Sequence, residues 1–317
     1  MIAARSAVFA AVVLFGSSCA HVGPPPTVVR PSPAQMAELW VDPGSEARNL
    51  FDGPSRGYER PSRGYERPTT EARFEVLERD TGGFSITYRV RDERGLEWTV
   101  KIGPEAQPEV VASRILWGLG YHQLPTFFVE RWTAVQDGRD QVLGGARFRP
   151  RKPGVDGKGT WAWRETPFVG TLEYDGLLTL LVLLNSTDLK ADNNELFEVE
   201  DPAPGEPRRL YIVKDLGASL GETGRFEPKR GSIDHFEREA FLRGREGPFV
   251  RFVFHGRHQD LLQHIPTVHM KWMCERVLGL SDRQLRDAFR AANYDPETTA
   301  RFIARIREKA REGLALP

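Results

Sequence analysis

The sequence is poor in three features that would each have narrowed its function. It has only two cysteines in 317 residues, its Lys plus Arg and Asp plus Glu counts are both 44, and past residue 19 it has no apolar run that approaches a membrane span. Because the charges balance, no basic excess points to nucleic acid as a partner. A chain of this length can also bury an adequate core without disulfides. The composition is therefore typical of a globular domain.

The N-terminus has the features of a bacterial secretion signal. Arg5 is followed by an apolar run from Ala7 to Phe15 and then by small residues that lead into Cys19. A basic start, a short apolar stretch and small residues before a cut site are typical of a cleaved signal peptide. The run is far shorter than the roughly twenty residues of a membrane-spanning helix. We therefore expect residues 1–19 to direct export out of the cytoplasm.

The residues before Cys19 resemble the lipobox of bacterial lipoproteins, in which the cysteine is acylated and becomes the new N-terminus. Lipoboxes usually carry Leu three positions before the cysteine, whereas Gly16 stands there and Leu14 lies two positions further back. The resemblance implies a membrane-anchored lipoprotein of the cell envelope, with Cys19 as the lipidation site. The alternative is an ordinary cleaved signal with an incidental cysteine. If Cys19 is acylated, Cys274 has no partner and no intramolecular disulfide is expected.

Residues 20–70 are expected to form a mostly unstructured, proline-rich tether. They contain Pro24–Pro26 and a PSRGYER heptad that occurs twice in tandem from Pro54 to Arg67. Proline and charge at this density cannot bury enough apolar surface to offset the entropy of ordering. The main interpretation is a stalk that holds a folded domain off a membrane. The alternatives are a ligand role for the tyrosine repeat and local docking of Met36–Trp40 and Asn49–Asp52.

The rest of the chain divides into two halves of different character. In residues 71–150, runs of period two separated by turns predict five strands, at 74–79, 84–90, 96–102, 126–135 and 141–149, with one helix, Glu109–Leu119, after the third. In residues 151–317 we expect an all-apolar buried helix at 177–184, a hairpin of 195–200 with 209–213, and further helices that include 285–292 and 297–312. The pattern predicts an α+β fold with an antiparallel five-stranded N-terminal lobe and a mainly helical C-terminal lobe.

Polar residues stand at special points in this order of elements. Lys101 ends the third predicted strand, and Glu109 lies in the first turn of the helix that follows. The loop after the buried helix reads Asp188-Leu-Lys-Ala-Asp-Asn193, and Asp215-Leu-Gly217 follows the predicted hairpin. Each short motif is weak alone, and the order of the elements gives them their weight.

This arrangement resembles the protein-kinase-like superfamily. Asp188–Asn193 is similar to its D-L-K-P-E-N catalytic loop, and Asp215–Gly217 is similar to its D-F-G metal motif. Lys101 and Glu109 stand where the third-strand lysine and its helix glutamate would be. The resemblance covers residues 73 to 220 by element order. It implies a bilobal kinase-like fold and ATP- and Mg²⁺-dependent phosphotransfer to a hydroxyl.

The resemblance also implies a role for each polar residue on the nucleotide side. Lys101 would bind the ATP phosphates, and Glu109 would hold that lysine in place. Asn193 and Asp215 would supply the hard oxygen ligands that Mg²⁺ prefers.

On the acceptor side, Asp188 would orient the substrate hydroxyl and accept its proton, while Lys190 would neutralise the transferring phosphate. The expected partners are a nucleotide, a protein or small-molecule acceptor that the sequence does not identify, and a membrane through the lipid anchor. Nucleic acid is not expected.

The sequence departs from the eukaryotic kinase pattern in several places. It has no G-x-G-x-x-G loop, because Gly82–Gly83 reads as a plain hairpin turn. Asn185-Ser-Thr stands before Asp188 where those kinases have His-Arg, and no A-P-E follows Asp215. These departures are similar to the atypical branch, which includes lipid kinases, bacterial persistence-toxin kinases and secretory-pathway kinases.

Each of these residues also has a structural interpretation. Lys101 could guard an edge strand, Glu109 could favour a helix N-terminus, and the polar residues of both loops could form turns through side-chain to backbone bonds. A second cluster, His255-Gly-Arg-His258, is expected to hold ordinary polar or packing histidines, since no Cys, Asp or Glu completes a zinc set.

The expected location bears on activity, because ATP is scarce outside the bacterial cytoplasm. This scarcity favours a rival hypothesis, a catalytically degenerate kinase-like module that binds or scaffolds at the cell envelope. A third hypothesis is an unrelated α+β envelope protein with chance motifs. Whether the protein is an enzyme is therefore open from the sequence.

Overall fold

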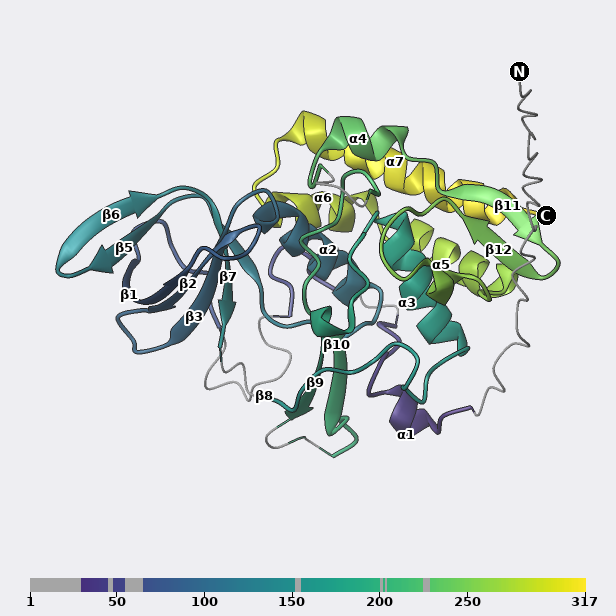
Figure 1. Cartoon of the computed structure of the whole chain (residues 1–317), viewed down its shortest axis with the longest axis horizontal. Helices are drawn as coiled ribbons and strands as arrows, with labels where there is room; N and C mark the ends of the chain where they lie inside the picture. The colour runs from purple at the N-terminus through teal and green to yellow at the C-terminus, as the bar shows by residue number, and fades with distance from the viewer. Residues whose placement is uncertain are drawn as a thin grey trace, which may run out of the picture.

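The structure is a computed structural model that describes residues 30–44, 48–54, 65–151, 155–199, 202, 204–224 and 229–317 (Figure 1). A sheet-rich N-terminal half and a mainly helical C-terminal half meet at helix α2 (Ala106–Gly118). This arrangement confirms the predicted α+β class. The signal peptide, the lipobox and Cys19 lie outside the described residues.

One seven-stranded sheet forms the core of the N-terminal half, in the spatial order β4-β7-β3-β2-β1-β5-β6. The prediction of five strands was wrong because each of the last two predicted strands is divided. The first is divided at Glu130–Arg131 and the second at Gly144–Gly145. The strands are β1 (Arg73–Asp80), β2 (Ile86–Arg91), β3 (Glu97–Ile102), β4 (Phe127–Val129), β5 (Trp132–Gln136), β6 (Arg139–Leu143) and β7 (Ala146–Pro150).

The last two predicted strands would have formed one long hairpin. Because both are divided, the two parts of this hairpin lie at opposite edges of the sheet. At one edge β4 pairs with β7, which pairs with β3; at the other edge β5 pairs with β6 and, in parallel, with β1. The parallel β1–β5 pair is a further departure from the antiparallel prediction. Only two residues link β4 to β5, and only two link β6 to β7, although the linked strands lie toward opposite edges of the sheet. The sheet therefore has to curl so that its two edges approach each other. Its inner face is filled by buried aromatic rings, with Trp132 in edge contact with Phe74 and Phe148.

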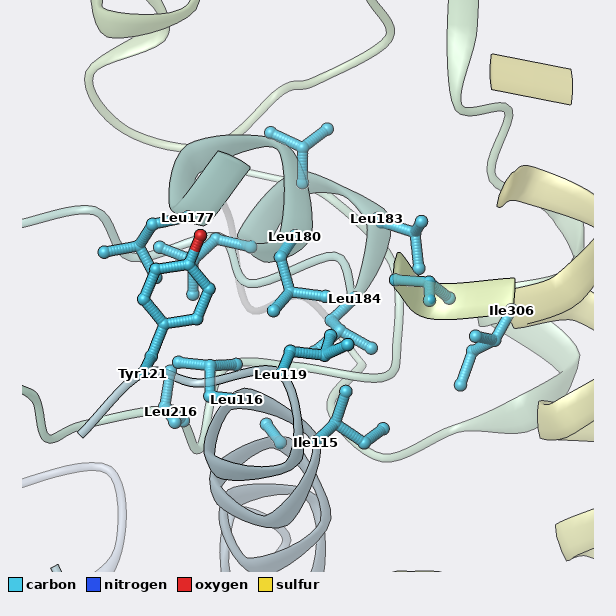
Figure 2. Packing of buried hydrophobic residues seen from close by; sticks show 14 of the residues in the cluster. Ile115, Leu116, Leu119, Tyr121, Leu177, Leu180, Leu183, Leu184, Leu216 and Ile306 are labelled. Carbon is cyan, nitrogen blue, oxygen red and sulfur yellow. The ribbon is translucent and has the colours of Figure 1, made fainter. Parts of the chain in front are cut away.

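The helical half is organised around α3 (Leu172–Leu183). No residue from Leu177 to Leu184 is more than 2% exposed, which confirms the predicted buried helix. Figure 2 shows Leu180 and Leu184 of this region beside Ile115 and Leu119, at the end of α2, so α2 shares one core with the helical half, while the sheet has a separate core. The other helices are α4 (Ile233–Arg238), α5 (Thr267–Gly279), α6 (Asp282–Ala291), which has the predicted Ser281–Gln284 capping box, and α7 (Pro296–Ala315).

Short strands interrupt the helical half. β9 (Asn194–Val199) and β10 (Arg209–Val213) form the predicted hairpin, and β8 (Val155–Gly157) adds a third strand to it. A second hairpin, β11 (Leu242–Glu246) with β12 (Phe249–Phe252), lies where the sequence predicted only helix. Its strands are short and rich in arginine, so their apolar alternation is too brief to signal a strand.

Parts of the predicted tether are packed against the folded domain, contrary to the expectation of a mostly unstructured segment. We call residues 30–44 and 48–54 the docked segment; it includes α1 (Pro33–Met36). Leu39 and Leu50 are fully buried, and the Trp40 indole donates a hydrogen bond of 2.7 Å to the carbonyl of Leu119. Docking of Met36–Trp40 and Asn49–Asp52, the alternative considered from the sequence, is thus what the structure shows. No helix among the described residues is long and apolar enough to cross a membrane.

Candidate functional site

Lys101 lies at the centre of an ionic cluster in which three carboxylates approach its ammonium group. Its Nζ is 3.0 Å from Oε2 of Glu109, 3.1 Å from Oδ1 of Asp215 and 3.3 Å from Oε2 of Glu105. Burial alone would lower the pKa of Lys101, but these carboxylates outweigh it and raise the pKa, so the amine stays charged. Because β3 pairs with both β2 and β7, Lys101 does not guard a sheet edge.

Glu109 is held by two arginines as well as by Lys101. It is fully buried in α2, and its Oε1 is 3.1 Å from Nε of Arg147 and 2.6 Å from a terminal nitrogen of Arg149. Burial raises the pKa of Glu109, and the three cations more than reverse this and lower it. A residue that only favoured a helix N-terminus would not need these partners. The sequence did not predict the arginines, although Arg147-Phe-Arg149 alternates along β7.

Glu105 is a site residue that the sequence did not predict, because it lies in the turn between β3 and α2. Its Oε2 accepts a 2.8 Å hydrogen bond from the Ser85 hydroxyl, and its other oxygen contacts Arg230. The Arg230 guanidinium also lies 3.9 Å from the ring centre of Phe84, in the β1–β2 turn. The turn after Gly82–Gly83 is therefore linked to the chain segment that follows Asp215.

Asn193 connects the Asp188 loop to the Asp215 segment. Its side-chain amide donates a 2.6 Å hydrogen bond to the carbonyl of Asp188, which is the turn-forming role considered above. Its own carbonyl accepts from the backbone N–H of Lys214 at 2.8 Å and of Asp215 at 3.4 Å. The two predicted motifs therefore lie side by side, and Lys101 reaches the second of them.

Asp188 lies between two cations. Its Oδ2 is 3.0 Å from Nζ of Lys190, and its Oδ1 is 3.7 Å from Nε of Arg257. Arg257 belongs to the His255–His258 motif and was not predicted as a site residue. In the same motif, the His255 ring contacts the Thr223 hydroxyl at 3.2 Å.

Asp215 and Asn193 fit a divalent cation in the type of oxygen they offer. Burial raises the pKa of Asp215, but the Lys101 charge and hydrogen bond hold it at about 2, so the carboxylate is ionised. Its hydrogen bonds to Lys101 and Gly217 both use Oδ1, and Asn193 bonds through its Nδ2, so each residue keeps an oxygen for a metal. Mg²⁺ takes only one or two such protein ligands, with water and phosphate completing its shell. In the described ranges no three His, Cys, Asp or Glu side chains gather as a metal site.

Comparisons with known proteins give kinases as structural neighbours. No family model matches the chain, and no curated protein matches it. The solved structures that match include a Helicobacter pylori proinflammatory kinase, CtkA, at a TM-score of 0.36 and 11% identity, over 79% of this chain and 100% of that chain. The Golgi casein kinase matches at a TM-score of 0.38 and 10% identity, over 78% of this chain and 74% of that chain. A structure of the Golgi casein kinase with Mn/ADP bound matches at a TM-score of 0.38 and 10% identity, over 78% of this chain and 73% of that chain.

Proposed function

We propose that the protein is an atypical kinase-like phosphotransferase that moves a phosphoryl group from ATP to a hydroxyl. The observation that carries the proposal is the Lys101–Glu109–Asp215 cluster. In this cluster the buried ammonium group of Lys101 is held between Glu109 of helix α2 and Asp215 in the segment after β10. Phosphoryl transfer depends on positioning and on neutralisation of charge more than on covalent chemistry.

The charge of the cluster suits a phosphate ligand. Its four cations exceed its three carboxylates, the members being Lys101, Arg147, Arg149 and Arg230 against Glu105, Glu109 and Asp215. Lys101 would contact the phosphates, and Glu109 would hold it in position. A site that is positive overall and partly buried favours polyphosphate, because charge interactions strengthen away from water.

The remaining predicted residues would complete the chemistry. Asp215 and Asn193 would hold a divalent cation that neutralises charge on the phosphates. Asp188 would accept the proton of the acceptor hydroxyl, and Lys190, 3.0 Å from it, would neutralise the phosphoryl group in transfer. These roles are the ones that the resemblance implied from the sequence.

The test is phosphotransfer by the full chain with γ-labelled ATP and Mg²⁺. Asp188→Asn should abolish transfer and leave nucleotide affinity unchanged, because Asp188 does not contact the Lys101 cluster. Asp192→Asn, an exposed carboxylate in the same loop, is the matched control and should transfer at the wild-type rate. Transfer by Asp188→Asn at the wild-type rate would contradict the proposal.

A second candidate function is the catalytically degenerate binding module. Nucleotide binding without transfer by the wild-type protein would support it. The feature that favours it is the N-terminal sequence, which supports export and anchoring at the cell envelope through Cys19, where ATP is scarce. Cys19→Ser should release the protein from the membrane fraction and block incorporation of labelled fatty acid. If the variant still takes up fatty acid, the anchoring proposal is wrong.

A further inference from the structure

Arg257 is held beside Asp188 by the backbone of its own loop. Its N–H donates a 3.0 Å hydrogen bond to the carbonyl of Thr187, the residue before Asp188. The loop approaches so closely that a Cβ on Gly256 would lie 2.5 Å from that same carbonyl oxygen. His258, on the other side, adopts a left-handed conformation with φ of 56°. The loop between β12 and α5 is therefore shaped to bring this arginine to the candidate base.

The guanidinium of Arg257 has donors to spare. Its Nε lies 3.7 Å from Oδ1 of Asp188, and its side chain is 64% exposed. Across the described chain, its side chain makes no hydrogen bond, and the acid that it pairs with is Asp188. Lys190 faces the other carboxylate oxygen and is 37% exposed. Both oxygens of Asp188 thus face a cation whose remaining donors are open to solvent.

The approach of Nε to Asp188 leaves the two terminal nitrogens of the guanidinium available for a further ligand. The planar fork of an arginine matches carboxylate and phosphate groups, which it binds through two parallel hydrogen bonds. We propose that Arg257, which faces the Asp188 oxygen that Lys190 does not, forms a subsite for an anionic group, a carboxylate or a phosphate, that the acceptor carries next to its reacting hydroxyl. This inference deepens the proposed function and rests on it.

The position of Arg257 assigns this subsite to the acceptor and not to the nucleotide. Among the described residues, Arg257 contacts Asp188 and Thr187 and makes no ion pair with the Lys101 cluster. An acceptor whose hydroxyl reaches Asp188 comes close to Arg257, whose Nε lies 3.7 Å from that carboxylate. A neutral acceptor would leave this exposed guanidinium unused, whereas an anionic one gains a charge-assisted pair.

The first experiment measures binding of small probes to the full chain by ligand-observed NMR, with and without ADP and Mg²⁺. The amino and α-carboxyl groups of the probes are blocked, so that N-acetylphosphoserine amide carries only a phosphate and N-acetylaspartic acid α-amide only a carboxylate. Both should bind, and the neutral N-acetylserine amide should not. Arg257→Gln should weaken both anionic probes about tenfold, the loss expected for a charge-assisted hydrogen bond. Arg243→Gln, an exposed arginine on β11, is the matched control and should bind as the wild type does. Preference for one of the two probes identifies the anion.

Two outcomes overturn the inference. Equal binding of the probes by wild type and Arg257→Gln means that Arg257 is not part of the subsite. A fall in ADP affinity with unchanged probe binding means that Arg257 serves the nucleotide. If the protein binds no ADP, the proposed function is wrong. The anion subsite is tested separately, because probe binding is also measured without nucleotide. Arg257→Lys keeps the charge but loses the planar fork, so its affinity for the anionic probes should lie between those of the wild type and Arg257→Gln.

Discussion

Lys101 on β3 and Asp215 after β10 are joined by an ion pair of 3.1 Å, although 114 positions separate them in the sequence. The pair links the sheet half to the segment after β10, which is hydrogen-bonded to Asn193 of the Asp188 loop, and Glu109 of α2 contacts the same ammonium group. One buried charge therefore joins β3 and the neighbouring helix α2 to a segment that is distant in the chain. This arrangement is the basis of the proposed phosphotransfer.

Glu109→Gln should strongly destabilise the protein. Glu109 has no exposed surface and faces Lys101, Arg147 and Arg149, so its neutralisation leaves three cations buried without their shared partner. Removing one partner of a buried ion pair costs about 3–5 kcal/mol. We expect the free energy of unfolding, measured by urea denaturation, to fall by about this amount.

The matched control for that prediction is Asp140→Asn. Asp140 pairs with Arg73 on the sheet surface, where the two side chains are 42% and 51% exposed. Surface pairs contribute about 1 kcal/mol or less. Equal losses in the two variants would mean that the cluster at Lys101 is no more than a surface network.

Lys309 predicts a pH dependence of stability. Lys309 belongs to α7 and has no exposed surface. Its amine donates a hydrogen bond of 2.8 Å to Oδ1 of Asn185 and lies 4.0 Å from the ring centre of Phe236. Burial lowers the pKa of Lys309 well below its ordinary value. Between this lowered pKa and the ordinary lysine pKa of about 10.4, the unfolded chain binds a proton that the folded chain does not, so stability rises with pH through that range.

Lys309→Met should remove this dependence. Between pH 7 and pH 10, the free energy of unfolding should rise more steeply in the wild type than in the variant. Lys271→Met, at a partly exposed lysine on α5, should keep the wild-type slope. Parallel slopes for wild type and Lys309→Met would show that Lys309 keeps its proton in the fold.

The docked segment should contribute to the stability of the domain. Leu39→Ala removes a fully buried side chain, and such substitutions cost about 2–5 kcal/mol. Val41→Ala, at a side chain 38% exposed in the same segment, should cost less than 1 kcal/mol and serves as the control. If Leu39→Ala unfolds at the wild-type urea concentration, residues 30–44 behave as a free tether.

Much of the fold could be predicted because its signals are local. Alternation marked β1 to β3, the Ser281–Gln284 box marked the start of α6, and the all-apolar run marked α3. The division of the long hairpin could not be predicted, since it depends on β5 pairing with β1, which lies far away in the sequence. The docked segment was underestimated because its composition is that of a linker, while Leu39 and Leu50 find partners only in the folded domain.

The candidate site shows the same limit. Lys101, Glu109 and Asp215 could be found because each stands at the end or start of a regular element, and the structure brings them within one cluster. Glu105 and Arg257 could not, since a turn and an unpredicted hairpin place them. No local pattern encodes such contacts; they follow from the packing of the two halves.

The central claim, that this cluster binds a nucleotide with a divalent cation, is tested most directly by the melting temperature of the full chain. With ATP and Mg²⁺ at about 100 times the dissociation constant, binding should add about 2.7 kcal/mol and raise the melting temperature by on the order of 5 °C. Asp215→Asn should abolish the rise that depends on Mg²⁺, and Asp140→Asn should keep it. A wild-type protein whose melting temperature is unchanged by every nucleotide, with or without Mg²⁺, would contradict the account.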